Sequence, residues 1–221
     1  MNTFEEGKVL LINKPLHWTS FDAVRKIRNL IRIKKVGHAG TLDPLATGLL
    51  IICTGKFTKK INEYMAREKE YTGSFTLGAT TPTYDLESEP GNFKSCEHFD
   101  DAAIKKAAAQ LTGNIMQVPP AHSAIKIDGK RVYELARQGK EVKIEPRRVT
   151  ISEFEITKIE MPKIYFRVVC STGTYIRSLA NDVGELLGCG AYLSSLCRTR
   201  IGEFELSSAM TMEDFAASIA K

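Results

Sequence analysis

Gly37-His38-Ala39-Gly40-Thr41-Leu42-Asp43-Pro44-Leu45-Ala46-Thr47-Gly48 is a glycine-rich stretch that runs directly into the apolar residues 49–54. The apolar run predicts a buried strand, and the residues before it, from about Lys34 to Gly48, predict a loop. Three glycines allow the loop backbone to adopt a positive φ and to approach a ligand closely. Pro44 biases the preceding Asp43 away from helical geometry, which displays the Asp43 carboxylate in a turn.

Asp43 is therefore a candidate catalytic residue. Basic residues lie upstream of it in the chain. An acidic side chain among basic groups, in a loop lined by glycine, suits a catalytic carboxylate that works beside a polyanion. An Asp-Pro pair read in isolation is more often an ordinary turn, so the pattern alone leaves both interpretations open.

The remaining apolar patterns predict strands and helices that do not alternate strictly. Strands are expected at residues 8–14, 49–54, 70–78, 149–160 and 163–171, and helices at 20–32, 101–111 and 174–187. This order favours an α+β fold, with a mixed, mostly antiparallel sheet and helices packed on it.

Two of these segments predict which side chains are buried. The helix that Ser20 is expected to cap has a predicted buried face of Phe21, Val24, Ile27, Leu30 and Ile31. The strand at 163–171 alternates so that one face carries Ile164, Phe166, Val168 and Cys170. In the helix at 20–32, basic side chains occupy the face opposite to the predicted buried one.

Residues 117–146 differ from the rest of the chain. They contain Pro119-Pro120, Gly129, Gly139 and many charges around a short helix expected near 131–138. We interpret them as an excursion from the sheet that clamps a substrate, with an ordinary surface crossover as the alternative. The whole chain, 1–221, is expected to form a single catalytic domain.

Composition excludes several classes of protein. The longest apolar run, residues 49–53, is too short to cross a bilayer, and the first residues lack the pattern of an export signal. We therefore expect a cytoplasmic protein without a membrane segment. Five cysteines without Cys-x-x-Cys spacing argue against a disulfide framework and against a zinc site, so no metal is expected.

Charge suggests a polyanionic partner. The net charge is 31 − 26 = +5, and the basic residues are clustered. The clusters comprise Arg25, Lys26, Arg28, Arg32, Lys34, Lys35, Lys56, Lys59, Lys60, Arg147, Arg148, Arg198 and Arg200. Such clusters neutralise phosphates in nucleic-acid complexes, although charge alone is equally compatible with a solvated surface.

The loop that carries Asp43 resembles the catalytic motif of the TruB family, the tRNA pseudouridine-55 synthases. Other stretches resemble further motifs of that family in the same order, from about residue 8 to about residue 206. These stretches are Leu11-Ile12-Asn13-Lys14-Pro15 with Trp18-Thr19-Ser20, Lys69-Glu70-Tyr71, residues 118–126 with Gly129 and 133–137, and residues 170–179.

The resemblance implies a pseudouridine synthase core, a uridine in the T loop of tRNA as substrate, and no metal or organic cofactor. It also implies roles for individual residues. Asp43 matches the family's catalytic aspartate, Arg177 the arginine that pairs with it, and Tyr71 the tyrosine that stacks on the target base. The positions that line the uracil pocket or contact the substrate are matched by His38, Tyr175, Leu196 and Asp85. Lys14 is interpreted as structural, holding the first strand against the catalytic loop.

Three functions remain open at this point. The first is a tRNA pseudouridine synthase that acts as a monomer without an obligatory protein partner, and without the separate C-terminal RNA-binding domain that many relatives carry. The second is a non-catalytic RNA-binding protein that helps tRNA to fold. The third is a guide-RNA-dependent synthase. An intact set of Asp43, Tyr71 and Arg177 favours the first.

Overall fold

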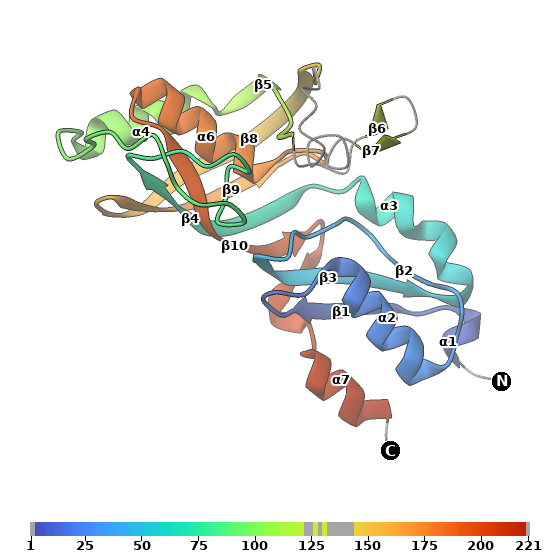
Figure 1. Cartoon of the computed structure of the whole chain (residues 1–221). Coiled ribbons are helices and arrows are strands. Elements are labelled where there is room, and N and C mark those ends of the chain that lie inside the picture. The colour runs from blue at the N-terminus through green and yellow to red at the C-terminus, as the bar shows by residue number, and fades with distance from the viewer. Residues whose placement is uncertain (1–2, 122–125, 128–129, 132–143, 220–221) are drawn as a thin grey trace. The chain divides into compact units, whose positions relative to one another are not determined.

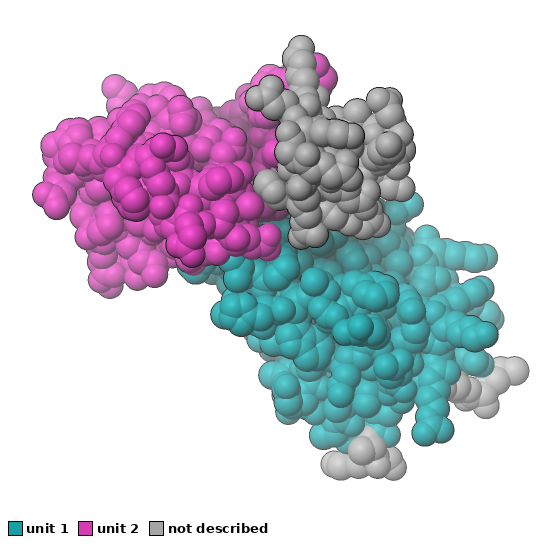
Figure 2. All heavy atoms as spheres, viewed as in Figure 1, with its two compact units in different colours: residues 1–72, 195–221 teal, residues 73–194 magenta. Residues whose placement is uncertain are grey.

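The computed structural model describes residues 3–121, 126–127, 130–131 and 144–219, and the chain divides into two compact units. Unit 1 comprises residues 1–72 and 195–221, and unit 2 comprises residues 73–194 (Figures 1 and 2). The helix expected near 131–138 lies outside the described residues. That 1–221 works as one catalytic domain stays a prediction.

The strands of unit 1 were only partly predicted from apolar runs. Its elements are α1 (Thr3–Glu6), β1 (Val9–Lys14), α2 (Ser20–Ile31), β2 (Val36–His38), β3 (Ala46–Thr54), η1 (Gly55–Lys60), α3 (Ile61–Met65), β11 (Phe204–Glu205), η2 (Leu206–Ser208) and α7 (Met212–Ile219). Strand β3 pairs antiparallel with β1 and β2 and parallel with β10 (Ala191–Ile201). Two strands, β1 and β3, were predicted from their apolar runs, whereas β2, β10 and β11 were not.

The two faces of β3 build the core of unit 1. On one face, Leu50 and Ile52 pack with α2 and with Phe215 of α7. On the other face, Leu49 and Ile51 pack in a second apolar cluster that draws in residues after β10. Because β3 is buried on both faces, its sequence is continuously apolar instead of alternating.

Unit 2 contains a second set of strands covered by helices. Its elements are β4 (Lys69–Leu77), α4 (Asp101–Gln110), β5 (Gly113–Gln117), β6 (Lys126–Ile127), β7 (Lys130–Arg131), β8 (Arg147–Glu160), β9 (Lys163–Cys170) and α6 (Ile176–Leu187). The strand order is β4-β9-β8-β5, with antiparallel pairing of β9 with β8 and of β8 with β5. Helices α4 and α6 contact each other, and α4 contacts β8. Strands β4 and β10 each contribute residues to both units.

The predicted α+β class with a mixed sheet is confirmed, since one parallel pairing, β3 with β10, occurs among antiparallel ones. The buried face predicted for β9 is also confirmed, because all four of its side chains are buried. The expected loop at 34–48 is partly wrong. It contains the short strand β2, and β3 begins at Ala46 instead of Leu49.

Helix α2 was predicted in the right place, but its start was interpreted wrongly. Thr19, not Ser20, is the N-cap, and it forms a capping box with Asp22. Ser20 points inward. Phe21, which we expected to be buried, is 58% exposed, because the buried stripe of the helix is centred on Ala23, Val24 and Ile27 and leaves Phe21 at its edge.

Candidate active site

The loop between β2 and β3 carries Asp43, and backbone hydrogen bonds fix it on both sides of that residue. The Leu42 N–H donates to Ser20 Oγ at 2.8 Å, and Ser20 Oγ donates to the Leu42 carbonyl at 3.1 Å. The Pro44 carbonyl accepts from the His17 N–H at 2.8 Å. Asp43 itself is half-buried. The turn before α2 therefore holds the peptides on either side of the carboxylate.

Arg198 supports the same loop from β10. Its side chain is buried and donates through Nε to the Leu49 carbonyl at 2.8 Å and through Nη2 to the Gly40 carbonyl at 3.1 Å, with a longer bond from Nη1 to the Thr41 carbonyl at 3.4 Å. We counted Arg198 among the residues that contact phosphates, and that interpretation is wrong. Its guanidinium donates to backbone carbonyls inside unit 1 instead.

Gly48 explains how Arg198 can lie so close to β3. Gly48 has a φ of 100°, and a Cβ at this position would lie 2.4 Å from the Arg198 carbonyl oxygen. Only glycine fits such an approach at this φ. Sequence reasoning identified the glycine but missed the arginine, because no pattern in the sequence distinguishes a buried arginine from its exposed neighbours on the same strand.

Lys14 is a second cation inside unit 1. Its side chain is buried, and Nζ donates to the Trp18 carbonyl at 2.6 Å and to the Pro15 carbonyl at 3.0 Å. Burial lowers the pKa of Lys14 to about 8, and the nearby Asp43 carboxylate opposes that shift. Lys14 is buried, as a structural role requires, but its hydrogen bonds go to the turn after its own strand. That it holds the first strand against the catalytic loop stays a prediction.

His38, Tyr71 and Leu196 lie in unit 1 with Asp43. His38 ends β2, and its Nδ1 is buried with no hydrogen-bond partner in the part of the chain that the structure describes. Burial, aided by the charge of Arg198, lowers the pKa of His38 and favours a neutral imidazole, while the Gly40 backbone opposes the shift. Leu196 pairs with Ala46, three residues after Asp43, and Tyr71 is buried on β4.

The other predicted residues lie in unit 2. Arg177, in the first turn of α6, is buried, with Nη1 3.5 Å from Asp85 Oδ2 and 3.2 Å from the Thr83 carbonyl oxygen to which it donates. Asp85 is buried as well, and its Oδ1 accepts from the Glu87 N–H. The pairing of Asp85 with Arg177 was not predicted. The expected pairing of Arg177 with Asp43 joins residues of different units and stays a prediction.

Tyr175 is held at the N-terminus of α6. Its N–H donates to Gln117 Oε1 at 2.8 Å, and its carbonyl accepts from Gln117 Nε2 at 3.1 Å. The Arg147 guanidinium lies 4.6 Å from the centre of the Tyr175 ring, which is within the range of a cation–π contact. One member of the predicted basic clusters therefore lies against a predicted substrate-pocket residue.

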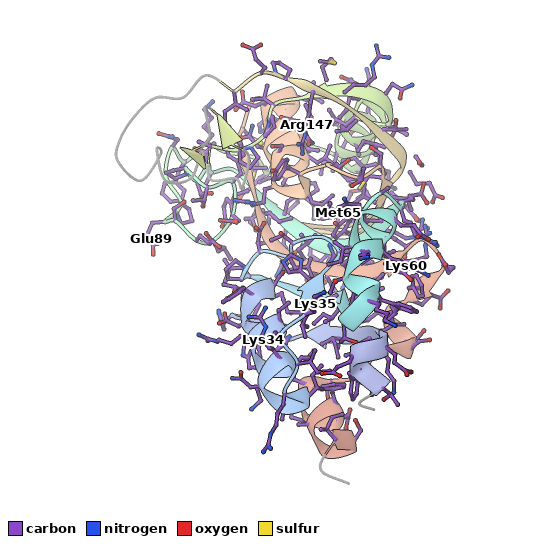
Figure 3. All side chains as sticks on the ribbon, turned by 90° about the vertical axis from the view of Figure 1, so that its right-hand side faces the viewer. Lys34, Lys35, Lys60, Met65, Glu89 and Arg147 are labelled. Atoms are coloured by element: carbon purple, nitrogen blue, oxygen red, sulfur yellow. The ribbon has the colours of Figure 1, made fainter. Side chains whose placement is uncertain are left out.

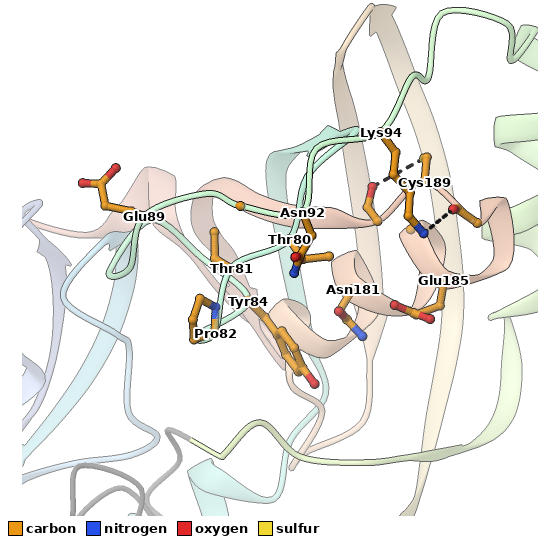
Figure 4. A pocket seen from close by; sticks show the side chains of 14 residues that line it. Thr80, Thr81, Pro82, Tyr84, Glu89, Asn92, Lys94, Asn181, Glu185 and Cys189 are labelled. Carbon is orange, nitrogen blue, oxygen red and sulfur yellow. Dashed lines mark hydrogen bonds between the residues drawn. The ribbon is translucent and has the colours of Figure 1, made fainter. Parts of the chain in front are cut away.

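A hollow of about 830 Å³ adjoins this part of unit 2 (Figure 4). The side chains of Tyr84, Asn181 and Glu185 line it, and Tyr84 directly precedes the buried Asp85. Burial raises the pKa of Asp182, next to Asn181, to about 6. Carboxylates and amides are among the groups on its walls.

Among the residues that the structure describes, no helix is both long and apolar enough to cross a membrane. Within the same part of the chain, His, Cys, Asp and Glu side chains nowhere gather in a group of three that could hold a metal ion.

Comparison with protein families finds two matches that together extend from residue 28 to the C-terminus. Residues 28–176 match the TruB family pseudouridylate synthase N-terminal domain, and residues 177–221 match the tRNA pseudouridylate synthase B C-terminal domain. The chain is 54% identical to tRNA pseudouridine synthase B of Flavobacterium johnsoniae, covering 97% of this chain and 96% of that protein. It is 49% identical to tRNA pseudouridine synthase B of Chlorobaculum tepidum, covering 98% and 92%.

Solved structures show the same fold in larger proteins. A chain in an H/ACA RNP bound to a substrate RNA containing 2′-deoxyuridine superposes with a TM-score of 0.73 at 25% identity. A chain in a Cbf5-Nop10-Gar1 complex gives a TM-score of 0.73 at 28% identity. In both cases the match covers 97% of this chain, which spans only about half (54%) of those chains.

Proposed function

The chain belongs to the TruB family of pseudouridylate synthases, and on this premise we propose that it isomerises the uridine at position 55, in the T loop of tRNA, to pseudouridine. The near-full-length relatives named tRNA pseudouridine synthase B support tRNA as the substrate. The solved H/ACA chains are less similar and about twice as long, which favours tRNA over a guide-RNA-dependent target.

The Asp43 loop is the observation that carries the proposal. The carboxylate is half-buried, and the peptides next to it are fixed by hydrogen bonds to the start of α2 and the turn before it. Arg198 also holds the loop by donating to the Gly40 carbonyl. Preorganisation of this kind keeps a reactive group in place without a cost at the moment of reaction. A carboxylate displayed in a surface turn would need none of these contacts.

In the proposed reaction, the bond from uracil N1 to ribose C1′ breaks, the base turns, and C5 bonds to C1′. Asp43 either attacks C1′ as a nucleophile or removes the 2′ proton so that a glycal forms. As C5 bonds to C1′, the bond from Asp43 to C1′ breaks on the first route, or C2′ regains its proton on the second. The C5 proton then leaves and N1 takes up a proton, and the Tyr71 hydroxyl assists removal of the C5 proton while the Tyr71 ring stacks on the base. Arg177 orients the Asp43 carboxylate and keeps it ionised.

The target base must leave the folded T loop before it can react. His38, Leu196 and Tyr175 line the pocket that receives it, and a neutral His38 with a buried, unsatisfied Nδ1 among the described residues suits contact with an uncharged base. Asp85 contacts the substrate, either while it stays paired with Arg177 or after it has exchanged Arg177 for the substrate. No cofactor takes part in this scheme.

The proposed working form is a monomer in the cytoplasm that needs no protein partner. The relatives named tRNA pseudouridine synthase B support an RNA substrate, and the described helices include none that could span a membrane.

The experiment that tests the proposal uses unmodified tRNA with tritium at uridine C5, without added metal or cofactor. We expect wild type to release one tritium per tRNA and Asp43→Asn to release none. Asp43→Asn is expected to bind tRNA within about 1 kcal/mol of wild type, since the carboxylate acts in the chemical step. Tight tRNA binding without release by wild type would instead support an RNA-folding chaperone.

A further inference from the structure

A hollow beside α2 in unit 1 plays no part in the proposed reaction. Its volume is about 340 Å³, which lies at the lower end of the range for small-ligand sites. The side chains that line it are His17, Trp18, Asp22, Arg25, Lys26 and Asn29. The size of the hollow suits a single small ligand, and its walls combine aromatic and basic groups.

Two aromatic side chains at the start of α2 are accessible to different extents. Trp18, the single tryptophan of the chain, is partly buried and packs against the core of unit 1. Phe21 is 58% exposed and lies one helical turn before Arg25. An aromatic surface beside basic side chains is the combination that binds unpaired nucleotides, because every base stacks and every phosphate carries a charge.

The cations of the hollow can reach a phosphate. Lys26 is exposed, and Arg25 pairs with Asp22 at 2.8 Å on the surface. Exposed pairs of this kind contribute little, so the Arg25 guanidinium can exchange the Asp22 carboxylate for a phosphate at small cost. The helix N-terminus does not supply the anion site, because Thr19 and Asp22 already cap it.

The hollow is linked to the Asp43 loop through the turn that forms its wall. His17 lines the hollow and donates its N–H to the Pro44 carbonyl, next to Asp43. Lys14 Nζ holds the Trp18 carbonyl at 2.6 Å. His17 has a φ of 65°, a left-handed conformation that is uncommon outside glycine and is often found where function requires it. A nucleotide in this hollow would therefore contact the turn that fixes the catalytic loop.

We propose that this hollow is a second nucleotide site for the RNA substrate, in which an unpaired base stacks on Trp18 and the adjoining phosphate binds Lys26 and Arg25. The site deepens the proposed function, on which it rests. It anchors a nucleotide other than the target uridine, and the exposed Phe21, one helical turn before Arg25, offers a second ring for stacking. Further basic side chains follow α2, with Lys34 and Lys35 in the next segment (Figure 3).

The single tryptophan gives a direct test. Trp18 emission is recorded while tRNA is added, and its access to the neutral quencher acrylamide is measured with and without saturating tRNA. Saturation is verified independently by filter binding. We expect tRNA to reduce both the emission and the access of acrylamide. Full binding of tRNA with emission and quencher access unchanged would overturn the proposal.

Paired variants test the cations and the exposed ring. We expect Arg25→Gln with Lys26→Gln to weaken tRNA binding about tenfold and to reduce its salt slope by about 2, one for each phosphate contact. The control is Lys105→Gln with Lys106→Gln, which removes the same charge from exposed positions of α4.

Phe21→Ala is expected to weaken tRNA binding about fivefold through lost stacking. Its control is Phe93→Ala, which removes a ring that is 77% exposed. Equal effects of variants and controls would contradict a specific site.

Tritium release from C5 is measured on the same preparations. If wild type releases tritium but Trp18 does not respond, the second site fails and the proposed function stands. If wild type binds tRNA and Trp18 responds, but no tritium is released, the proposed reaction fails and the nucleotide site stands.

Discussion

Unit 1 buries Arg198 and unit 2 buries Arg177, and the partners of the two arginines differ in kind. Arg198 donates to three backbone carbonyls, and two of these belong to the loop of Asp43. Arg177 lies beside the Asp85 carboxylate and donates to the Thr83 carbonyl. Neutral acceptors hold a backbone in one conformation, whereas a carboxylate also sets the charge of its surroundings. We infer that Arg198 fixes the conformation of the catalytic loop and that Arg177, with Asp85, sets the charge of its surroundings.

Arg198→Met should have the largest effect on stability. The substitution leaves three carbonyls without their donor in the interior of unit 1, and hydrogen bonds from charged donors contribute roughly 1.5–3 kcal/mol each. We expect the free energy of unfolding in urea to fall by roughly 4–6 kcal/mol, with the loss of tritium release. Arg200→Met, on the same strand but partly exposed and bonded to Gly202 and Glu68, should lose about 1 kcal/mol. Similar losses in both variants would remove the special role of Arg198.

Asp85→Asn tests the other side of the comparison. Breaking a buried ion pair by removing one partner costs about 3–5 kcal/mol, because the remaining charge is left uncompensated. We expect a loss of about 3 kcal/mol, at the low end, because the asparagine oxygen still accepts from the Glu87 N–H. The measurement is a double-mutant cycle with Arg177→Met in urea. Additive effects of the two substitutions would show that Asp85 and Arg177 do not stabilise each other.

The two arginines also mark the reach of sequence reasoning. The alternating apolar run of β9 and the continuous apolar run of β3 predicted both strands, because the burial of a strand depends on residues adjacent in the sequence. The burial of Arg198 and the pairing of Asp85 with Arg177 depend on residues far apart in the chain, and no local pattern encodes them. Resemblance to a family supplied the candidate residues. It did not supply their partners within each unit.

Phe21 shows the same limit on a smaller scale. Its spacing from Val24 is compatible with the buried face of a helix, yet its ring is exposed because the stripe that packs on the sheet ends before it. Hydrophobic spacing predicts the direction of the buried face but not its edges. An aromatic residue at such an edge can therefore be a candidate binding residue even when its sequence spacing assigns it to the core.

Lys14 gives a prediction of intermediate size that depends on pH. Its pKa is lowered from 10.5 to about 8 in the folded chain, so above pH 8 the unfolded chain binds more protons than the folded one. Stability should therefore rise with pH, by about 1 kcal/mol between pH 8 and 9. The comparison is with Lys14→Met, which should lack this rise. A parallel pH dependence of the two proteins in urea would contradict a buried, titrating Lys14.

The window of pH 8 to 9 is chosen because of Cys53. Burial raises the pKa of its thiol from 9.0 to about 11, so its contribution to stability is lost as pH rises from about 9 towards 11. That trend opposes the trend from Lys14. Subtracting the Lys14→Met profile from that of wild type removes the contribution of Cys53, which both proteins share.

The helix caps provide the smallest expected effect and the sharpest contrast between units. Thr19 caps α2 in unit 1, and Asp100 caps α4 in unit 2 through the Ala103 N–H at 2.8 Å. Replacing either residue by alanine should cost about 1 kcal/mol of unfolding free energy. Only Thr19→Ala should also reduce the rate of tritium release, by about two- to fivefold. Thr19 lies between His17, which is bonded to Pro44, and Ser20, which is bonded to Leu42, on either side of Asp43. Equal rates for the two alanine variants, at matched losses of stability, would show that the start of α2 does not position the catalytic loop.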